Sequence, residues 1–358
     1  MKILQLTSSR FIGGGERHVA DLSRALSERG HDIFVGVAPN AAIRAELLFL
    51  PAESIVEFPL RNSADLRSAL DIAKFVKENG IDLIHAHVAR DYPVAAIAAR
   101  VSRTPFVITR HVLFPMNRLH RILLRNARCV IAPSDAVAES LRRQRIFPEE
   151  KIVTIKHGLD ASKYVARPVI EKVECVVGSI GNLDPVKGFD ILVRAAAVVS
   201  EHIPNGRFEI AGDDRSLDGR NRRDLIALIS SLNLNDRVAL IGWAKDTRDA
   251  LAGFDIFVSA SRSESFGYAI AEAMLSGVPV IATETEGAKE IFGSSEVGVL
   301  VPVDSPDDLA KAIIGLLKDR ARRDSYTTAG REHVEKNFSI ERMIEETEAL
   351  YRRVLNMP

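Results

Sequence analysis

The sequence has few cysteines and no long apolar run. Its two cysteines, Cys129 and Cys175, lie far apart and give neither a disulfide framework nor the paired spacing of a zinc site, as is typical of proteins from a reducing compartment. No apolar stretch reaches the ~18 residues that a membrane-spanning helix needs. An expected strand at 2–8 follows Met1 directly, so we expect no signal peptide and a cytoplasmic location.

The sequence also lacks an excess of charge of either sign. It contains 48 Lys and Arg and 48 Asp and Glu. The charge is unevenly spread, because residues 1–167 hold 25 Lys and Arg against 17 Asp and Glu, a net charge of +8. Such asymmetry indicates either an anionic partner of the first half or an uneven solvated surface. We expect no nucleic-acid partner.

What is present is a repeated alternation of strands and helices. The opening runs from a strand at 2–8 through a Gly-rich turn and an amphipathic helix to a second strand at 31–39. Further strands are predicted at 81–89 and 104–112. This order opens a doubly wound α/β nucleotide-binding domain. The run Gly13–Gly15 lacks the G-x-G-x-x-G spacing, so it does not indicate NAD.

The same pattern starts again in the second half. Buried strands are predicted at 173–181, 208–212, 237–242, 255–261 and 278–283, with helices between them. At 358 residues the chain is long enough for two domains, each with its own core. We place these at 1–167 and 168–339, joined by a linker at 166–172, and expect a last helix at Ile340–Leu355 within 340–358.

The most informative stretch is Ser259–Pro279, SASRSESFGYAIAEAMLSGVP. It predicts a strand, a loop carrying Glu264, and a helix over Tyr268–Leu275 that carries Glu272. The start of such a helix offers unpaired backbone N–H groups and a partial positive charge, which suit a phosphate. Two carboxylates beside it suit the hydroxyls of a sugar and a ribose, although each glutamate could equally be an ordinary solvated acid.

This stretch closely resembles the E-x7-E signature of the family 4 glycosyltransferases, retaining enzymes that use nucleotide-sugar donors. The resemblance implies that Glu264 contacts the donor sugar and that Glu272 contacts the ribose hydroxyls. GGGERHV resembles the family's first glycine loop, with Gly13 and Gly14 at its glycine pair. His111, which follows VITR, resembles the family histidine near the reacting centre.

Two further segments resemble the family, each with a departure. GNLDPVKG resembles G-R-L-x-x-x-K-G, which implies that Lys187 meets the diphosphate, but Asn182 stands where the family usually has arginine. TETEGAKEI resembles T-x-x-G-G-x-x-E-I, with Glu286 in place of the first glycine. Like these, HGLD resembles the family's N-G-V-D turn, with His157 where asparagine is usual.

The resemblance implies a GT-B fold: two Rossmann-like domains facing across a cleft, with the last helix crossing back to the first domain. It implies transfer of a hexose from a UDP- or GDP-sugar to a glycan, lipid-linked or small-molecule acceptor, as in cell-envelope polysaccharide synthesis. It implies no cofactor and no metal ion. The catalytic residues would be His111, Lys187 and Glu264, and the donor-binding residues would be Gly13, Gly14, Asn182, Lys187, Ser265, Phe266, Gly267, Tyr268, Ala269 and Glu272.

Several alternatives stay open. Asn182 leaves room for a catalytically weakened subunit that binds glycans or stabilises a partner, and the same two-domain plan also serves nucleotide-sugar epimerases. His85 and His87 share a strand face, as metal ligands do, but no third ligand is expected nearby. Arg118–Arg128 predicts a basic amphipathic helix, which suits either a peripheral contact with an anionic membrane or an ordinary half-buried position.

Overall fold

The computed structural model describes residues 1–165, 174–216 and 218–356. The chain divides into two compact units, unit 1 (Met1–Gly158 with Ile340–Pro358) and unit 2 (Leu159–Ser339). The linker expected at 166–172 lies outside the described residues. Unit 2 begins at Leu159, whereas the sequence places the boundary at 167–168.

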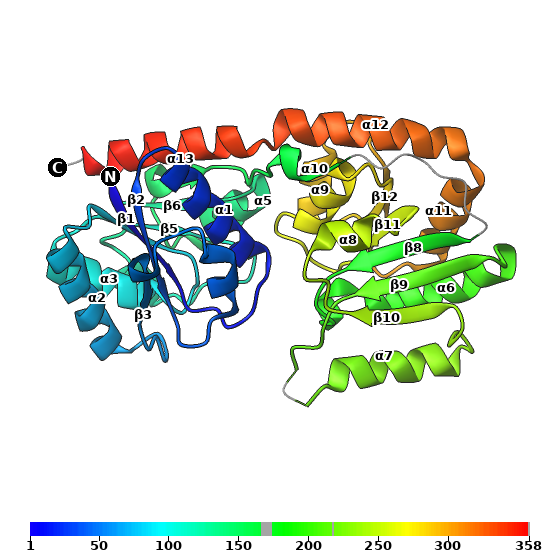
Figure 1. Cartoon of the computed structure of the whole chain (residues 1–358), viewed down its shortest axis with the longest axis horizontal. Coiled ribbons are helices and arrows are strands. Elements are labelled where there is room, and N and C mark those ends of the chain that lie inside the picture. Colours follow the sequence, from blue (N-terminus) through cyan, green and yellow to red (C-terminus); the bar gives the residue numbers. More distant parts are fainter. Residues whose placement is uncertain (166–173, 217, 357–358) are drawn as a thin grey trace. The chain divides into compact units, whose positions relative to one another are not determined.

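Unit 1 is built on a seven-stranded parallel sheet with the order β3-β2-β1-β4-β5-β6-β7 (Figure 1). Its strands are β1 (Lys2–Thr7), β2 (Asp32–Val37), β3 (Ile55–Glu57), β4 (Leu83–Ala86), β5 (Phe106–Thr109), β6 (Cys129–Ala132) and β7 (Ile152–Thr154). The order reverses between β1 and β4, as in doubly wound folds, where ligands collect beyond the carboxyl ends of the strands at this switch.

Helices cover both faces of this sheet because successive strand residues point to opposite sides. Leu4 and Leu6 pack on the face covered by α2, α3 and α5, whereas Ile3 and Val35 pack on the face covered by α1 and α13. The helices are α1 (Gly14–Glu28), α2 (Leu66–Asn79), α3 (Tyr92–Ser102), α4 (His120–Leu123), α5 (Asp135–Gln144) and α13 (Ile340–Leu355). The predicted return of the last helix to the first domain is confirmed.

Unit 2 repeats the plan with a six-stranded parallel sheet, order β10-β9-β8-β11-β12-β13, and its switch lies between β8 and β11. The strands are β8 (Cys175–Ile180), β9 (Gly206–Ala211), β10 (Val238–Gly242), β11 (Ile256–Ser259), β12 (Val280–Thr283) and β13 (Val299–Val301). One face is covered by α6 (Phe189–His202), α7 (Arg220–Ser231) and α11 (Pro306–Lys318). The other is covered by α8 (Thr247–Leu251), α9 (Tyr268–Leu275), α10 (Glu286–Phe292) and α12 (Arg320–Asn337).

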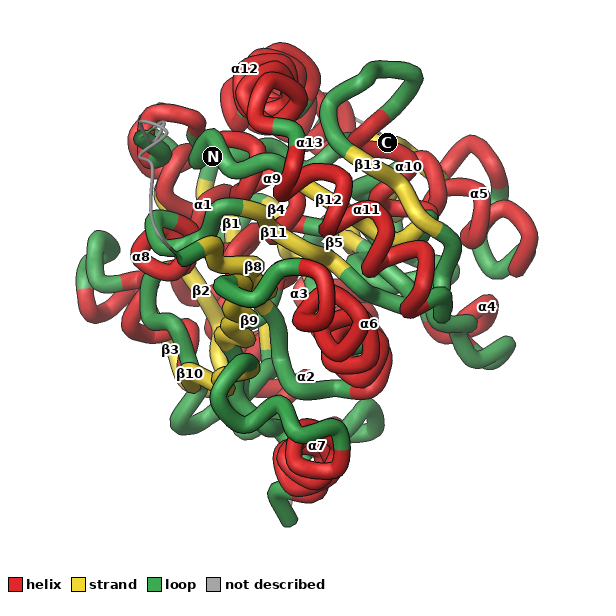
Figure 2. Tube along the Cα trace, turned by 90° about the vertical axis from the view of Figure 1, so that its right-hand side faces the viewer, coloured by secondary structure: helices red, strands yellow, loops and turns green. Residues whose placement is uncertain are grey.

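The basic helix expected at Arg118–Arg128 is wrong. Only α4, His120–Leu123, is helical there, and turns flank it at the surface of unit 1 (Figure 2). The arginines at helical spacing and the apolar residues between them predicted the helix. Those apolar residues, Leu119, Ile122 and Leu123, are exposed, whereas Leu124 is buried, so the expected apolar face does not pack on the unit. No helix among the described residues is long and apolar enough to span a bilayer.

Candidate active site

In unit 2, Lys187 and Glu264 meet at the switch between β8 and β11. Lys187 ends the short 3-10 turn Pro185–Lys187 in the loop after β8, and Glu264 lies in the loop after β11. The Lys187 ammonium forms an ion pair with Glu264 Oε1, which also accepts a hydrogen bond from Ser261 Oγ at 2.9 Å. The side chains are 26% and 15% exposed. A cation and a carboxylate are thus held together at the edge where the fold binds ligands.

Glu272 lies on α9, the helix that begins beside this pair. It is only 3% exposed, and its Oε1 accepts a hydrogen bond from Tyr164 Oη at 3.1 Å. The residue before the helix, Gly267, has a φ of +101°, a left-handed conformation that side chains other than glycine rarely adopt. Gly267 therefore permits the sharp turn from the loop into α9, which directs the first N–H groups of the helix towards the loop end.

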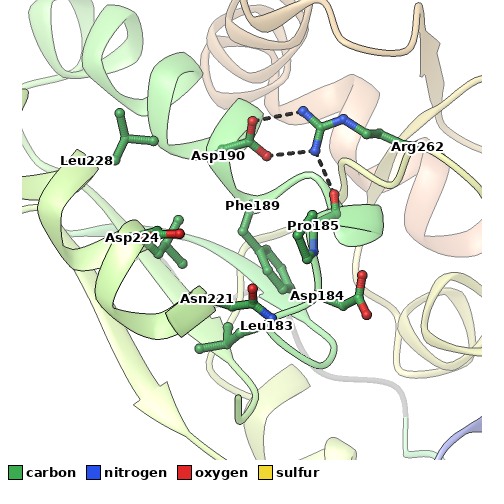
Figure 3. Close-up of a pocket in the computed structure, with 10 residues that line it drawn as sticks. Leu183, Asp184, Pro185, Phe189, Asp190, Asn221, Asp224, Leu228 and Arg262 are labelled. Carbon is green, nitrogen blue, oxygen red and sulfur yellow. Dashed lines mark hydrogen bonds and ion pairs between the residues drawn. The ribbon is translucent and has the colours of Figure 1, made fainter. Parts of the chain in front are cut away.

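Arg262 fastens the two loops of this site to each other (Figure 3). Its guanidinium donates to both carboxylate oxygens of Asp190, at 2.9 and 2.8 Å, and to the Pro185 carbonyl at 2.6 Å. Its backbone N–H donates to the Val186 carbonyl at 2.7 Å. Hydrogen bonding to Asp190 raises the pKa of Arg262, so the clamp stays charged. Arg262 thereby holds the Lys187 turn against the loop that carries Glu264.

The pocket in Figure 3, of about 180 Å³, lies between the same turn and α7. Leu183 and Phe189 line it together with the carboxylates of Asp184, Asp190 and Asp224. Arg262 lines the pocket as well, and Asp190 and Asp224 are ion-paired with Arg262 and Arg220, so the charge of the pocket is largely balanced.

Two glycines allow backbone segments to approach each other closely at this site. A Cβ on Gly287 would lie 2.5 Å from the Phe266 carbonyl oxygen, and a Cβ on Gly212 would lie 1.7 Å from that of Gly181. Only glycine allows these approaches.

Asn182 Oδ1 is buried and has no hydrogen-bond partner among the described residues. An acceptor left unpaired beside the site suits a ligand hydroxyl better than a phosphate.

In unit 1, the glycine loop and His111 lie together. Gly13 precedes α1, and its N–H donates to Glu16 Oε2 at 2.9 Å, which closes the first turn of the helix. A Cβ on Gly15 would lie 3.4 Å from the His111 ring, so the backbone of α1 rests against that imidazole. The N-terminus of α1 and His111 thus form one surface beyond the carboxyl ends of β1 and β5.

A chain of hydrogen bonds joins the half-buried His111 to three buried histidines. His18 Nδ1 lies 3.0 Å from His157 Nδ1, and His157 Nε2 lies 3.4 Å from His111 Nδ1. His111 Nε2 lies 3.2 Å from His87 Nδ1, and His87 Nε2 lies 2.7 Å from Gln5 Oε1. Gln5, His87 and His111 converge because they share the face of the sheet covered by α1 and α13.

Gln5 gives this histidine chain a direction. Its carbonyl oxygen can only accept, so His87 carries its proton on Nε2 and accepts on Nδ1. The same step repeats along the chain: His111 carries its proton on Nε2, His157 on Nε2 and His18 on Nδ1. Every neutral imidazole then donates once and accepts once, apart from His18 at the open end. The amide cannot accept a proton, so the chain orients its imidazoles without conducting protons past Gln5.

The amide nitrogen of Gln5 is hydrogen-bonded to a residue of α13. Its amide Nε2 donates to Tyr351 Oη at 3.5 Å, and the distance from Tyr351 Oη to His85 Nδ1 is 2.5 Å. His85 Nε2 lies 2.7 Å from Thr109 Oγ1. Burial raises the pKa of Tyr351, which therefore stays a neutral donor. The last helix of the chain thus completes the polar core beneath the candidate site.

Burial keeps these histidines uncharged. It lowers the pKa of His18 to about 3. Burial, and then the neighbouring imidazoles, hold the pKa values of His85, His87, His111 and His157 well below the usual range. A protonated imidazole cannot accept, so protonation of His87, His111 or His157 would break the chain.

The sequence indicated His85 and His87 as a possible ligand pair, but the structure groups His87 with His18 and His111 and not with His85. One nitrogen atom from each of His18, His87 and His111 lies within 4.8 Å of the others, close enough to adapt to one metal ion. Nevertheless, His87 Nδ1 and His111 Nε2 are hydrogen-bonded to each other, so the lone pair that a metal would need is already engaged.

The structure thus gathers the predicted residues into two groups. Unit 1 holds Gly13, Gly14 and His111, and unit 2 holds Asn182, Lys187, Glu264, Ser265, Phe266, Gly267, Tyr268, Ala269 and Glu272. The Phe266 side chain packs in the core of unit 2, so only its backbone is offered to the site. Sequence reasoning missed the partners Gln5, Tyr164, Arg262 and Tyr351. His85, His87 and His157 were the sequence signals for the polar core of unit 1 that contains Gln5 and Tyr351, and no signal pointed to Tyr164 or Arg262.

Comparisons with known proteins agree with this geometry. Residues 161–333 match the family model "Glycosyl transferases group 1", and residues 12–163 match "Glycosyltransferase Family 4". The chain is 26% identical to N-acetyl-alpha-D-glucosaminyl L-malate synthase of Bacillus anthracis, over 96% of this chain and 95% of that one. It is 28% identical to the lipopolysaccharide core biosynthesis glycosyltransferase LpsE of Rhizobium meliloti, over 92% and 93%.

A solved structure shows the same architecture. The crystal structure of Anabaena HepE in complex with UDP and glucose matches with a TM-score of 0.87 and 25% identity, over 99% of this chain and 100% of that one. Two Rossmann-like units, the family matches over both, and relatives that are glycosyltransferases along their whole length lead to one conclusion. The chain belongs to the family 4 glycosyltransferases and is a glycosyltransferase of the GT-B fold.

Proposed function

We propose that this glycosyltransferase moves a hexose from a nucleoside diphosphate sugar to a glycan, lipid-linked or small-molecule acceptor, with retention at the anomeric carbon and without a metal ion. The observation that carries the proposal is the arrangement of Lys187, Glu264 and Glu272 around the start of α9. The HepE structure holds UDP and glucose, which supports a UDP-sugar as the donor.

In this proposal Lys187 changes partner when the donor binds. The ammonium leaves Glu264 and faces the diphosphate, where it offsets the negative charge that grows on the leaving nucleotide. The backbone N–H groups at the start of α9 support the same charge. The freed Glu264 carboxylate accepts from hydroxyl groups of the sugar, so one ion pair supplies both halves of donor recognition.

Glu272 and His111 have the remaining roles. Glu272, oriented by Tyr164, accepts hydrogen bonds from the ribose hydroxyls. His111, held as the neutral Nε2–H tautomer, lies beside the N-terminus of α1, which is the part of unit 1 that suits an anionic or polar donor group. We assign no side chain as a covalent nucleophile. Retention is accordingly expected to follow from a same-face displacement in which the leaving diphosphate assists the acceptor.

Titration calorimetry with UDP and GDP tests the donor site. We expect Glu272→Ala to weaken nucleotide binding by about one to two decades, the loss of a hydrogen bond to a charged group. Glu264→Ala should leave binding of the free nucleotide nearly unchanged and lower turnover of the sugar nucleotide. Wild-type binding and turnover in both variants would contradict the site. The anomeric proton coupling in the product, with and without a chelator, tests retention and metal independence.

Asn182 offers a test of its own. Arginine at this position would add a bidentate phosphate contact that Lys187 alone does not give. Asn182→Arg is therefore expected to tighten UDP binding, and Lys187→Ala to abolish most of it. If neither change alters affinity, the diphosphate lies elsewhere.

A further inference from the structure

Unit 1 has a basic hollow that takes no part in the proposed donor site. It has a volume of about 400 Å³ and lies between the α4 segment and the turn after α5. Arg121, Arg125, Arg145 and Lys151 supply its polar wall, and Ile146 and Phe147 belong to its apolar wall. We call these residues the basic hollow. The cations come from three separate segments, so the fold, rather than one helix, brings them together.

Within the described part of the chain, the arginines of the hollow are not neutralised by ion pairs. None of Arg121, Arg125 and Arg145 has an ion-pair partner among the described residues. This contrasts with Arg142 and Arg143 on α5, which both pair with Glu139. Like charges repel one another when no anion lies between them, so a hollow with several unpaired cations favours an anionic ligand.

Lys151 is held in place at the floor of this hollow. Its ammonium donates to the carbonyl oxygens of Arg125 at 2.9 Å and Ala127 at 2.7 Å. These bonds fix the lysine and the backbone of Arg125 in one position. The hollow is therefore pre-formed on one side, whereas the arginine side chains are exposed and can adjust to a ligand.

Exposed apolar side chains border the hollow. Leu119 is 61% exposed and Ile122 is 66% exposed, and Leu123 beside them is also exposed. Ile122 and Leu123 are chain neighbours of Arg121, which lines the hollow. Large apolar residues next to unpaired cations suit the boundary between lipid headgroups and acyl chains, where apolar groups are buried and cations meet phosphates.

We propose that the basic hollow binds the phosphate group of an anionic phospholipid while Leu119, Ile122 and Leu123 enter the membrane interface. The inference rests on the lipid-linked acceptor of the proposed function and specifies how the peripheral membrane contact expected from the sequence is made. It does not depend on the donor site. The net charge of +8 on residues 1–167 acts in the same direction over longer distances.

Co-sedimentation of the full chain with vesicles tests this proposal. We expect binding to phosphatidylglycerol vesicles at low salt and little binding to phosphatidylcholine vesicles. Each Lys or Arg near an anionic surface changes the partition constant by about five-fold. The double variant R121Q/R125Q should therefore lower the partition constant by roughly 20- to 30-fold. The variant I122S/L123S should lower it as well, and its effect should persist at high salt, where exposed charge is screened.

The matched control is R142Q/R143Q, which removes the same charge from α5 outside the hollow. It should stay close to the wild type. UDP binding, measured on every variant, shows that the protein is folded and separates a failure here from a failure of the donor site. The proposal is overturned if R121Q/R125Q binds phosphatidylglycerol vesicles as the wild type does. It is also overturned if the control R142Q/R143Q loses as much binding as R121Q/R125Q does. Binding of inorganic phosphate in the hollow by a wild-type protein that does not sediment with phosphatidylglycerol vesicles would make it a soluble-anion site and would overturn the proposal too.

Discussion

Mild acid is expected to unfold unit 1 before unit 2, because unit 1 holds its histidines buried and neutral. The folded pKa of His18 is about 3, whereas that of an unfolded histidine is about 6.5. A base whose pKa is lowered by folding stabilises the fold fully above the unfolded value, and this contribution is lost as the pH falls towards the folded value. Between pH 7 and pH 4, His18 alone accounts for a loss of about 3 kcal/mol.

The change in the free energy of unfolding of unit 1 also depends on the other buried histidines and on one carboxyl group. Protonation of the other buried histidines, such as His85 and His87, lowers the free energy of unfolding in the same direction. These residues share hydrogen bonds, so their contributions are not additive. Asp91 acts in the opposite direction, because burial raises its pKa to about 6 and its protonation returns about 2 kcal/mol by pH 4. The histidine losses exceed this gain and form a large part of the 5–15 kcal/mol that stabilises a typical domain.

The assay is hydrogen exchange read by mass spectrometry over a series of pH values, corrected for the intrinsic exchange rate, because its peptides separate the two units. Unit 1 peptides should lose protection between about pH 6 and pH 4 while unit 2 peptides keep theirs. His18→Gln, whose amide can still donate to His157, should flatten this dependence, and His202→Gln in unit 2 should not. A free energy of opening for unit 1 that stays level from pH 7 to pH 4 would refute the reasoning.

Three further changes can be tested on the same protein. Asp91→Asn should raise the free energy of unfolding at pH 7 by up to about 3 kcal/mol and have little effect at pH 4. The reason is that the buried Asp91 carboxyl group, with a pKa of about 6, destabilises the fold only at pH values where it is ionised. Urea titration at pH 7 and pH 4 checks this. Gln5→Leu leaves the His87 N–H without its acceptor, so the same titration should show a loss of about 1–3 kcal/mol, and nitrogen-15 shifts of the imidazoles should show mixed tautomers in place of one. Arg262→Lys cannot keep both bonds to Asp190, so calorimetry should show UDP binding weakened by roughly ten-fold; unchanged affinity would mean that the clamp does not position Lys187.

Local patterns were enough to predict most of the architecture. The runs at 2–8 and 255–261 are rich in apolar residues and end in small polar residues, which is typical of central parallel strands. The short edge strands β3 and β13 were not predicted, since three residues carry too little periodicity. The helix expected at Arg118–Arg128 is wrong because the spacing of charged and apolar residues does not say which apolar residues the fold will bury.

The candidate site was predictable only in part, for a related reason. Lys187, Glu264 and Glu272 follow from loops at strand ends, and the fold gathers such loops at one edge. The contacts that orient them come from distant segments: Tyr164 bonds to Glu272 across more than 100 positions, and Tyr351 reaches His85 from the last helix. A pairing of this kind depends on tertiary structure, which no local pattern encodes.

The discontinuous course of unit 1 has a consequence for how the two units can be separated or exchanged. Unit 2 is an insertion between Gly158 and Ile340, so cutting the chain after Gly158 would remove α13 and with it Tyr351, Met343 and other buried members of the unit 1 core. During synthesis, unit 2 is complete before unit 1 can close. A chimaera that exchanges unit 2 should therefore replace residues 159–339 as one cassette and leave both flanks native, because unit 1 is assembled from the two ends of the chain.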